Sequence, residues 1–262
     1  MERTDLLALY DEEMRRVVQY PDLRREESDN VVRLVGTPEP NGGNFVIYSR
    51  LTMANADQVI DEQIAYFDAI GHPFEWKVYD HDTPPDLRDR LLARGFTQRD
   101  SADAIMAIDL HDLPDGLQPS PDIAVRKLQR REELQDVIAV LESVWPGDDT
   151  NWLERVIGND MVERPDFTSV YVATVAGVPA CCGWVLFHAD THFASLWGGS
   201  TVATYRQQGL YRAVLATRLQ AARRRGFRWA TIDASPMNKP IAAHYGFQLL
   251  TMAQACFWRF PE

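Results

Sequence analysis

The 262-residue sequence predicts a mixed α/β fold made of two similar units in tandem. Apolar runs of strand length alternate with helical periodicity along the whole chain. In addition, residues 74–96 and 227–247 match in order: each begins with Phe-x-Trp, has an Asp and a prolyl segment in the middle, and ends in Gly-Phe. We therefore expect a domain over residues 1–112, a linker over 113–122 and a second domain over 123–262, each with a central twisted sheet and flanking helices.

The first half is predicted to contain four strands and two helices. The longer helix has an Asn or Asp cap at its start and Gly71 as its stop, and the shorter one begins with Pro85. A turn at Gly42-Gly43 joins the first two strands. The predicted strands cover 31–36, 44–51, 74–80 and 102–110, and the predicted helices cover 55–71 and 85–95.

The second half follows a similar alternation. Strands are predicted over 122–128, 191–202 and 227–234, a hairpin over 167–190, and a strand or hairpin over 247–260. Helices are predicted over 131–145, 151–157, 210–225 and 237–246. The helix over 210–225 has one apolar stripe, which we expect to pack on the sheet, while its arginines, including Arg212 and Arg218, are expected to lie elsewhere. The stripe consists of Tyr211, Val214, Leu215, Leu219 and Ala222.

Composition narrows the classes of function. The net charge of −11 argues against a nucleic-acid partner, because phosphate binding needs a basic surface. Such a charge would attract cationic amines, although solubility alone accounts for most of it. The three cysteines, Cys181, Cys182 and Cys256, have neither a disulfide pattern nor zinc spacing, so we expect them to be reduced and no metal to be bound. With no signal core and no apolar run of spanning length, we expect a cytoplasmic monomer or homodimer without a membrane partner.

The stretch YRQQGLYRAVL, residues 205–215, is typical of an anion-binding loop. The first turn of a helix has main-chain N–H groups without partners, and Gly209 lets a ligand approach the backbone closely. Arg206 adds a positive charge, so the loop suits a diphosphate. The simpler interpretation is that Gly209 is only a turn glycine. Neither of the common glycine-rich phosphate motifs of nucleotide-binding proteins occurs in the chain.

The wider context resembles the GNAT superfamily of N-acetyltransferases. A strand ending in GGSTVA, the loop, a long helix, a strand and the segment ASPMNKPIAAHYGF follow in that family's order, from Ile123 to about Phe260. The family's motif, Gln/Arg-x-x-Gly-x-Gly/Ala, falls on residues 206–211. Tyr211 departs from it, because the family has Gly or Ala at this position.

The resemblance implies a site for acetyl-CoA. In the family, the strand before the loop splays from its neighbour and pairs with the pantetheine arm, while the loop amides hold the diphosphate. Asn238 matches a cofactor-contacting Asn of the family, and it is equally suited to cap the following helix. The implied cofactor-binding residues are Gly199, Ser200, Thr201, Val202, Arg206, Gln207, Gln208, Gly209, Leu210, Tyr211, Arg212 and Asn238.

The resemblance also implies an amine acceptor, and with it a base, an N–H donor to the acyl oxygen and an acid. The donor is expected to be the main-chain N–H near Ser200. The strand over 192–202 has no carboxylate, so Asp190 and His192 at its beginning are the candidate bases. The family's acidic Tyr position is occupied by Ala242, which leaves Tyr245 as the candidate acid.

The acceptor is expected to be a small-molecule or peptide amine that meets the segment 144–152, where Asp148 and Asp149 could attract it. The first half lacks the Arg-x-x-Gly pattern, so we expect it to bind no CoA and to stabilise the second half or shape its acceptor cleft. Two alternatives stay open: a catalytically silent acyl-CoA-binding sensor or regulatory module, and a structural protein that binds no ligand.

Overall fold

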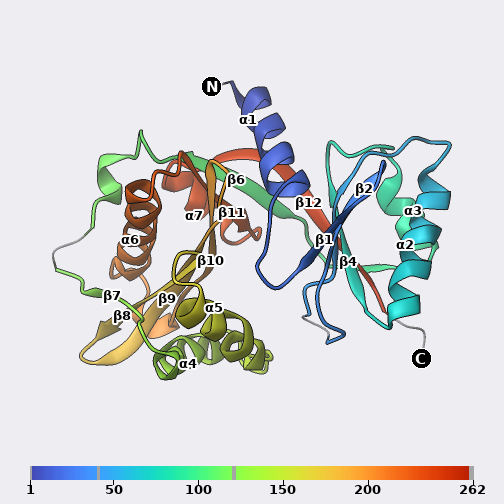
Figure 1. Cartoon of the computed structure of the whole chain (residues 1–262). Coiled ribbons are helices and arrows are strands. Elements are labelled where there is room, and N and C mark those ends of the chain that lie inside the picture. The colour runs from blue at the N-terminus through green and yellow to red at the C-terminus, as the bar shows by residue number, and fades with distance from the viewer. Residues whose placement is uncertain (1, 40–41, 120–121, 260–262) are drawn as a thin grey trace. The chain divides into compact units, whose positions relative to one another are not determined.

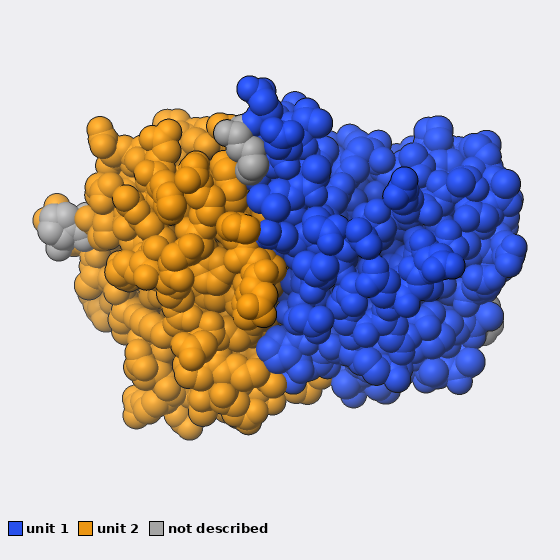
Figure 2. Space-filling model, turned by 45° about the horizontal axis from the view of Figure 1, so that its top comes forward, with its two compact units in different colours: residues 1–106, 234–241, 249–262 blue, residues 107–233, 242–248 orange. Residues whose placement is uncertain are grey.

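The computed structural model describes residues 2–39, 42–119 and 122–259. The predicted linker residues 120–121 and the last three residues of the chain lie outside the described part. The chain forms two compact units (Figure 2), called unit 1 (residues 1–106, 234–241 and 249–262) and unit 2 (residues 107–233 and 242–248). The segments 234–241 and 249–262, which the sequence grouped with the second half, thus lie in unit 1. The reason is pairing along the sheet, since the last strand of the chain pairs with a strand of the first half.

Unit 1 is built around a sheet with the strand order β1-β2-β3-β4-β12-β6, and β5 also pairs with β12 (Figure 1). Its strands are β1 (Arg24–Glu27), β2 (Val31–Val35), β3 (Phe45–Ser49), β4 (Phe74–Tyr79), β5 (Thr97–Gln98), β6 (Asp103–Asp109) and β12 (Gln248–Trp258). Its helices are α1 (Arg3–Tyr10), the π-helical segment η1 (Asp11–Arg16), α2 (Ala56–Ile70) and α3 (Leu87–Ala93). The last residues of β6, from 107 on, belong to unit 2. Helix α7 (Lys239–His244) is divided between the units, with residues 239–241 in unit 1 and 242–244 in unit 2.

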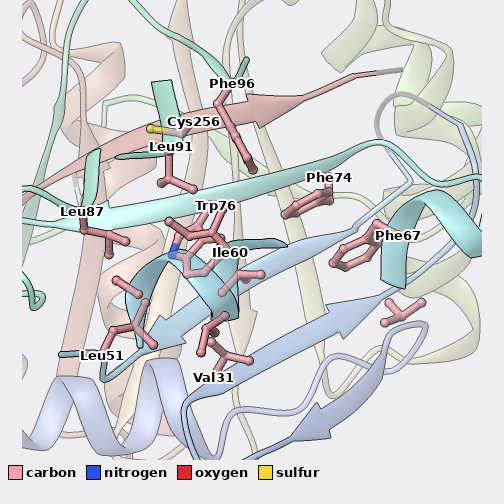
Figure 3. Packing of buried hydrophobic residues seen from close by; sticks show 14 residues of the cluster. Val31, Leu51, Ile60, Phe67, Phe74, Trp76, Leu87, Leu91, Phe96 and Cys256 are labelled. Atoms are coloured by element: carbon pink, nitrogen blue, oxygen red, sulfur yellow. The ribbon is translucent and has the colours of Figure 1, made fainter. Parts of the chain in front are cut away.

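The core of unit 1 lies between its sheet and helices α2 and α3 (Figure 3). Ile60 and Phe67 of α2 and Trp76 of β4 are fully buried. The rings of Phe67 and Phe74 stack with their centroids 4.2 Å apart. This core is the one that the apolar stripe of the predicted helix 55–71 requires.

Unit 2 has the strand order β11-β10-β9-β8-β7. Its strands are β7 (Val125–Lys127), β8 (Thr168–Val175), β9 (Val178–Phe187), β10 (Phe193–Thr201) and β11 (Trp229–Ala234). Its helical segments are η2 (Asp115–Leu117), η3 (Arg131–Leu134), α4 (Gln135–Val144), η4 (Leu153–Ile157), α5 (Gly158–Glu163), η5 (Ala203–Tyr205) and α6 (Leu210–Arg224).

Helices cover both faces of the unit 2 sheet (Figure 1). On β9, the Trp184 ring packs against Trp152, which directly precedes η4, with ring centroids 6.1 Å apart. The next residue back, Gly183, faces Arg218 of α6. Because successive strand residues point to opposite faces, α6 covers one face and η4 the other.

The predicted mixed α/β class is confirmed. The periodic segments fold as expected, and the C-terminal segment is a single strand, β12. The N-terminal helices α1 and η1 and the short strands β1 and β5 were not predicted. The predicted helix 131–145 is divided into η3 and α4, and the helix begun at 151 continues through α5.

One prediction about α6 is wrong. Val214, Leu215, Leu219 and Ala222 are fully buried as expected, but Arg218 is buried with them. Position 218 lies three and four residues after Leu215 and Val214, so it shares their face. The three cysteines are buried and form no disulfide bond. None of the described helices is both long and apolar enough to cross a membrane.

Candidate functional site

The candidate site begins at the loop between β10 and α6. Gln207 and Gly209 both have left-handed backbone conformations, with φ of 63° and 80°. Gly209 is the residue that caps the start of α6. A glycine adopts this conformation at little cost, whereas a residue with a β-carbon is strained there. Alternation of left-handed and ordinary residues turns successive N–H groups toward one side, which is the geometry of anion-binding nests.

The main-chain N–H groups of this loop divide into paired and free groups. Tyr205 donates to the Val202 carbonyl at 2.9 Å, and Ala213 donates to the Gly209 carbonyl at 3.0 Å. Between these two, the six N–H groups of residues 207–212 meet no acceptor within the described ranges. The helix adds a dipole equivalent to about +0.5 elementary charge at this end. The loop is therefore an unsatisfied cluster of donors with positive potential.

The side chains around the loop leave it open to solvent. Arg206, Gln207 and Gln208 are exposed. The Arg206 Nε donates to the Thr201 carbonyl at 3.2 Å, which holds the guanidinium beside the end of β10. Neither Arg206 nor Arg212 forms an ion pair with any residue that the structure describes. Both charges are thus available to an anion bound at the loop.

Strand β10 parts from β11 as it approaches the loop. The parallel pairing of β10 with β11 covers Phe193 to Ser195. The antiparallel pairing with β9 continues to Thr201, and the Val202 N–H still bonds to the Ala180 carbonyl at 3.0 Å. The edge of β10 that faces β11 is consequently left without strand pairing after Ser195, as the splayed strand in the predicted site requires.

A β-bulge interrupts β10 on the side that pairs with β9, because the register with β9 shifts between Trp197 and Ser200. Two residues of β10, Gly198 with φ of 62° and Gly199, oppose the single residue Gly183 of β9, so one residue is extra. A β-carbon on Gly198 would overlap the Trp184 ring. Bulges redirect main-chain groups out of the ladder, so this one changes the direction of the main-chain groups of Gly198 and Gly199.

Tyr211 and Tyr245 lie together beside the bulge. A β-carbon built on Gly199 would be 3.2 Å from the Tyr211 ring. The Tyr245 ring lies with its centroid 6.0 Å from that of Tyr211. Burial raises the pKa of Tyr211. The structure thus brings Tyr245, the predicted acid, together with the loop and the bulge.

Asp190 and His192 do not lie near the loop. Both are exposed and precede β10, at the strand end opposite to the loop. His192 is eight residues before Ser200, and a strand rises about 3.3 Å per residue, which separates them by roughly 25 Å. Side-chain length does not bridge that distance. The order of the sequence already places these residues before the strand and the loop after it, so the length of the strand separates them.

The other predicted site residues have local roles in the structure. Ser200 and Thr201 pair with Cys182 and Cys181 of β9. The Thr201 hydroxyl also donates to the Cys181 sulfur at 3.2 Å. Asn238 directly precedes α7, and its N–H donates to the Ser235 carbonyl at 2.9 Å. Asn238 lies in the 234–241 segment of unit 1, and its contact with a cofactor stays a prediction.

A buried polar group under β10 was missed from the sequence. The His188 Nε2 lies 2.7 Å from the Ser195 Oγ, and the Trp197 indole N–H donates to the same oxygen at 2.9 Å. Burial lowers the pKa of His188 to about 4, so its ring is neutral at pH 7. The Ser195 hydroxyl oxygen therefore accepts from the Trp197 indole and shares a second hydrogen bond with the neutral His188 ring. Ser195 is the last residue of β10 that pairs with β11.

Tryptophans line the face of the unit 2 sheet that η4 covers. Trp197 stands directly opposite Trp184 in the ladder and is 38% exposed. Trp184 in turn packs against Trp152. Asp148 and Asp149, in the predicted acceptor segment, are exposed.

A separate cavity of about 210 Å³ lies in unit 1. Its walls come from the end of β4, the start of α3 and Gln254 of β12. None of the loop residues 205–212 lines it. The free donors, and not this cavity, therefore define the candidate site.

Comparison with known proteins shows the same fold in N-acetyltransferases. No family model and no curated protein matches the sequence. Among solved structures, a GCN5-related N-acetyltransferase from Kribbella flavida superposes with a TM-score of 0.70 and 16% identity, covering 99% of this chain and 96% of that one. A functionally unknown conserved protein from Staphylococcus epidermidis reaches a TM-score of 0.69 with 14% identity over 94% and 98% of the two chains. A tandem GNAT protein from the clavulanic acid biosynthesis pathway reaches 0.61 with 13% identity over 98% and 94%. The chain therefore has the fold of the GCN5-related N-acetyltransferases.

Proposed function

We propose that this protein is an acetyl-CoA-dependent N-acetyltransferase that transfers an acetyl group to a primary amine. One observation carries the proposal: the six free N–H groups of residues 207–212 stand directly after a strand whose edge has lost its partner. Free donors at a helix start suit a diphosphate, and an unpaired strand edge suits an extended amide-containing arm. CoA contains both groups.

The residues present fit this cofactor. The loop amides and the charges of Arg206 and Arg212 would hold the diphosphate, and the open edge from Gly199 to Val202 would pair with the pantetheine arm. Bound acetyl-CoA would supply an activated acyl group. The positive φ of Gly209 is part of the fit, because a side chain there would strain the loop.

The chain itself would supply two further functions. Main-chain N–H groups of the bulge residues Gly198 and Gly199 would donate to the acyl oxygen, whereas the N–H of Ser200, the predicted donor, faces Cys182 of β9. Tyr245 would donate a proton, since its ring lies beside Tyr211 and the bulge. The acceptor would be a small-molecule or peptide amine, attracted by the net negative charge and by Asp148 and Asp149.

An assay of thiol release from acetyl-CoA against a panel of primary amines tests the proposal. We expect amine-dependent release of CoA and an acetylated product by mass spectrometry. The Tyr245→Phe variant should lose turnover but still bind CoA. CoA binding without consumption of any amine would contradict the transferase.

A second candidate is favoured by a specific observation. Strand β10 carries no carboxylate, and Asp190 and His192 lie at the opposite end of the strand from the loop. A site that binds acyl-CoA but lacks a proton acceptor would act as a sensor or regulatory module. Acyl-CoA binding with hydrolysis as the only turnover would support this alternative.

A further inference from the structure

Helix α6 contains a charged residue that the proposed function has not used. Arg218 is 1% exposed and lies under the bulge of β10. Its Nη1 donates to the Trp197 carbonyl at 3.0 Å and to the Trp184 carbonyl at 3.3 Å. Its Nη2 is buried and has no hydrogen-bond partner in the described part of the chain.

No carboxylate balances this charge among the described residues. The titratable groups that act on Arg218 are Tyr211, Cys181, Cys182 and Tyr171. Burial raises the pKa of each of these four groups, so all are neutral at pH 7. Burial lowers the pKa of Arg218, but a guanidinium remains protonated. A buried cation without a counterion is costly, and an apolar residue of similar size is often no less stable.

The position of Arg218 depends on two glycines. A β-carbon on Gly183 would lie 2.7 Å from the Arg218 Nη1, and one on Gly199 would lie 3.3 Å from its Nη2. The guanidinium thus fills space that β9 and the bulge leave vacant. The bulge, the glycines and the arginine form one arrangement.

This arrangement fixes the direction of a particular peptide group. The Trp197 carbonyl points to Arg218, and in a planar trans peptide the N–H of the next residue points the opposite way. The N–H of Gly198 is therefore directed away from α6. On the other face, the Trp197 indole is fixed by its bond to Ser195. Trp197 is held from both faces of the sheet.

We propose that Arg218 is a positioning residue, which holds the carbonyls of Trp184 and Trp197 so that the N–H groups of the bulge face the acyl oxygen. The inference rests on the proposed function, because it assigns those N–H groups to the acyl group of acetyl-CoA. It assigns no contact between Arg218 and the ligand. Its role is indirect, through the backbone of Trp197 and Gly198.

The first test measures the bound acyl group. Acetyl-CoA labelled with ¹³C at the thioester carbonyl is bound to the protein, and the carbonyl stretch is read by isotope-edited infrared spectroscopy. We expect a shift to lower frequency in the wild type, loss of the shift in Arg218→Met, and a partial shift in Arg218→Lys. The affinity for CoA should be unchanged, because the diphosphate loop is intact. Arg223→Met, an exposed residue at the end of α6, is the matched control.

The second test needs no ligand. Amide hydrogen exchange at Gly198 and Gly199 should be about tenfold faster in Arg218→Met, the effect of losing one hydrogen bond of ordinary strength. An unchanged infrared shift in a folded Arg218→Met protein, or unchanged exchange, would overturn the inference. If Arg218→Met does not fold, both criteria apply to Arg218→Lys. If the wild type does not bind acetyl-CoA, the proposed function fails, and the exchange measurement decides the role of Arg218 separately.

Discussion

The first turns of α2 and α6 occupy similar places in the fold but differ in how many of their main-chain N–H groups are hydrogen-bonded. Both helices have fifteen residues and connect two strands that pair in parallel, β3 with β4 and β10 with β11. At α2, the Thr52 N–H donates to the Asn55 side chain at 2.7 Å, and the Ala56 N–H donates to the Thr52 carbonyl at 3.1 Å. At α6, the N–H groups of residues 207–212 have no acceptor among the described residues. Of the two helix starts, α6 has six successive N–H groups without an acceptor in the described part of the chain, whereas at α2 the unbonded N–H groups are separated by the bonded ones of Asn55 and Ala56.

The strand edges differ in the same way. The pairing of β3 with β4 covers Phe45 and Val46, and beyond it the Arg15 Nε donates to the Ile47 carbonyl at 3.0 Å. Arg15 also bonds to both oxygens of Asp82, which follows β4, at 2.7 and 2.9 Å. A side chain of the protein thus occupies the edge in unit 1. Past Ser195 of β10, no strand pairing with β11 takes that place. We therefore predict that unit 1 binds no CoA, because the Arg15 side chain already occupies the edge between β3 and β4.

The largest effect on stability is expected when Arg15 is removed from the edge between β3 and β4. Arg15→Ala leaves Asp82 buried without its partner and should lower the free energy of unfolding by about 3–5 kcal/mol. Arg16→Ala, next to it, removes only exposed ion pairs with Glu12 and Glu27 and should cost less than about 1 kcal/mol. Urea denaturation of both variants measures the difference. Equal losses would show that Arg15 does not stabilise unit 1 through its buried pair.

The next largest effect is a loss of stability at low pH, which we expect to arise from His188 in unit 2. Its pKa is about 4 in the folded chain, against an ordinary value of 6.5, so below pH 6.5 the unfolded chain binds a proton that the folded chain does not. Stability should fall as the pH falls from 6.5 to 4, by about 3 kcal/mol in total at roughly 1.4 kcal/mol per pKa unit. The His188→Gln variant should lack this component. Denaturation at pH 7 and pH 4.5 tests it, and an equal pH dependence in variant and wild type would contradict it.

One substitution in the loop before α6 should weaken CoA binding. Gly209→Asp adds a strained backbone and a negative charge where the diphosphate would bind, and should weaken CoA binding by about 100-fold, or roughly 2.7 kcal/mol. Met53→Asp places the same charge in the turn just before α2, where the residue is 60% exposed, and should leave the affinity unchanged. Calorimetry measures both. Similar affinities in the two variants would remove the distinction between the two sites.

The smallest effect is expected at the cap of α2. Asn55→Ala removes the acceptor of the Thr52 N–H and should cost about 1 kcal/mol of stability. CoA affinity should not change. A gain of CoA binding by this variant would mean that the two helix starts differ less than the structure indicates.

Local patterns in the sequence predicted much of this difference. The apolar stripe of α6 predicted which face of that helix is buried, and Gly209 was predicted to mark the turn into it. Arg218 was misplaced, because its charge was taken as a sign of exposure although its spacing put it on the buried face. The pairing of β12 with β4 depends on contacts across the whole chain, which no local pattern encodes. Asp190 and His192 were chosen by residue type, although the sequence already places the whole strand between them and the loop.

The most direct measurement is a titration of the ¹⁵N-labelled protein with CoA, followed by NMR of the main-chain amides. We predict that the chemical shifts of the amides of residues 207–212 change and saturate, while those of residues 52–58 do not change. CoA that binds while the loop amides stay unmoved, or saturating CoA that shifts no amide at all, would contradict it.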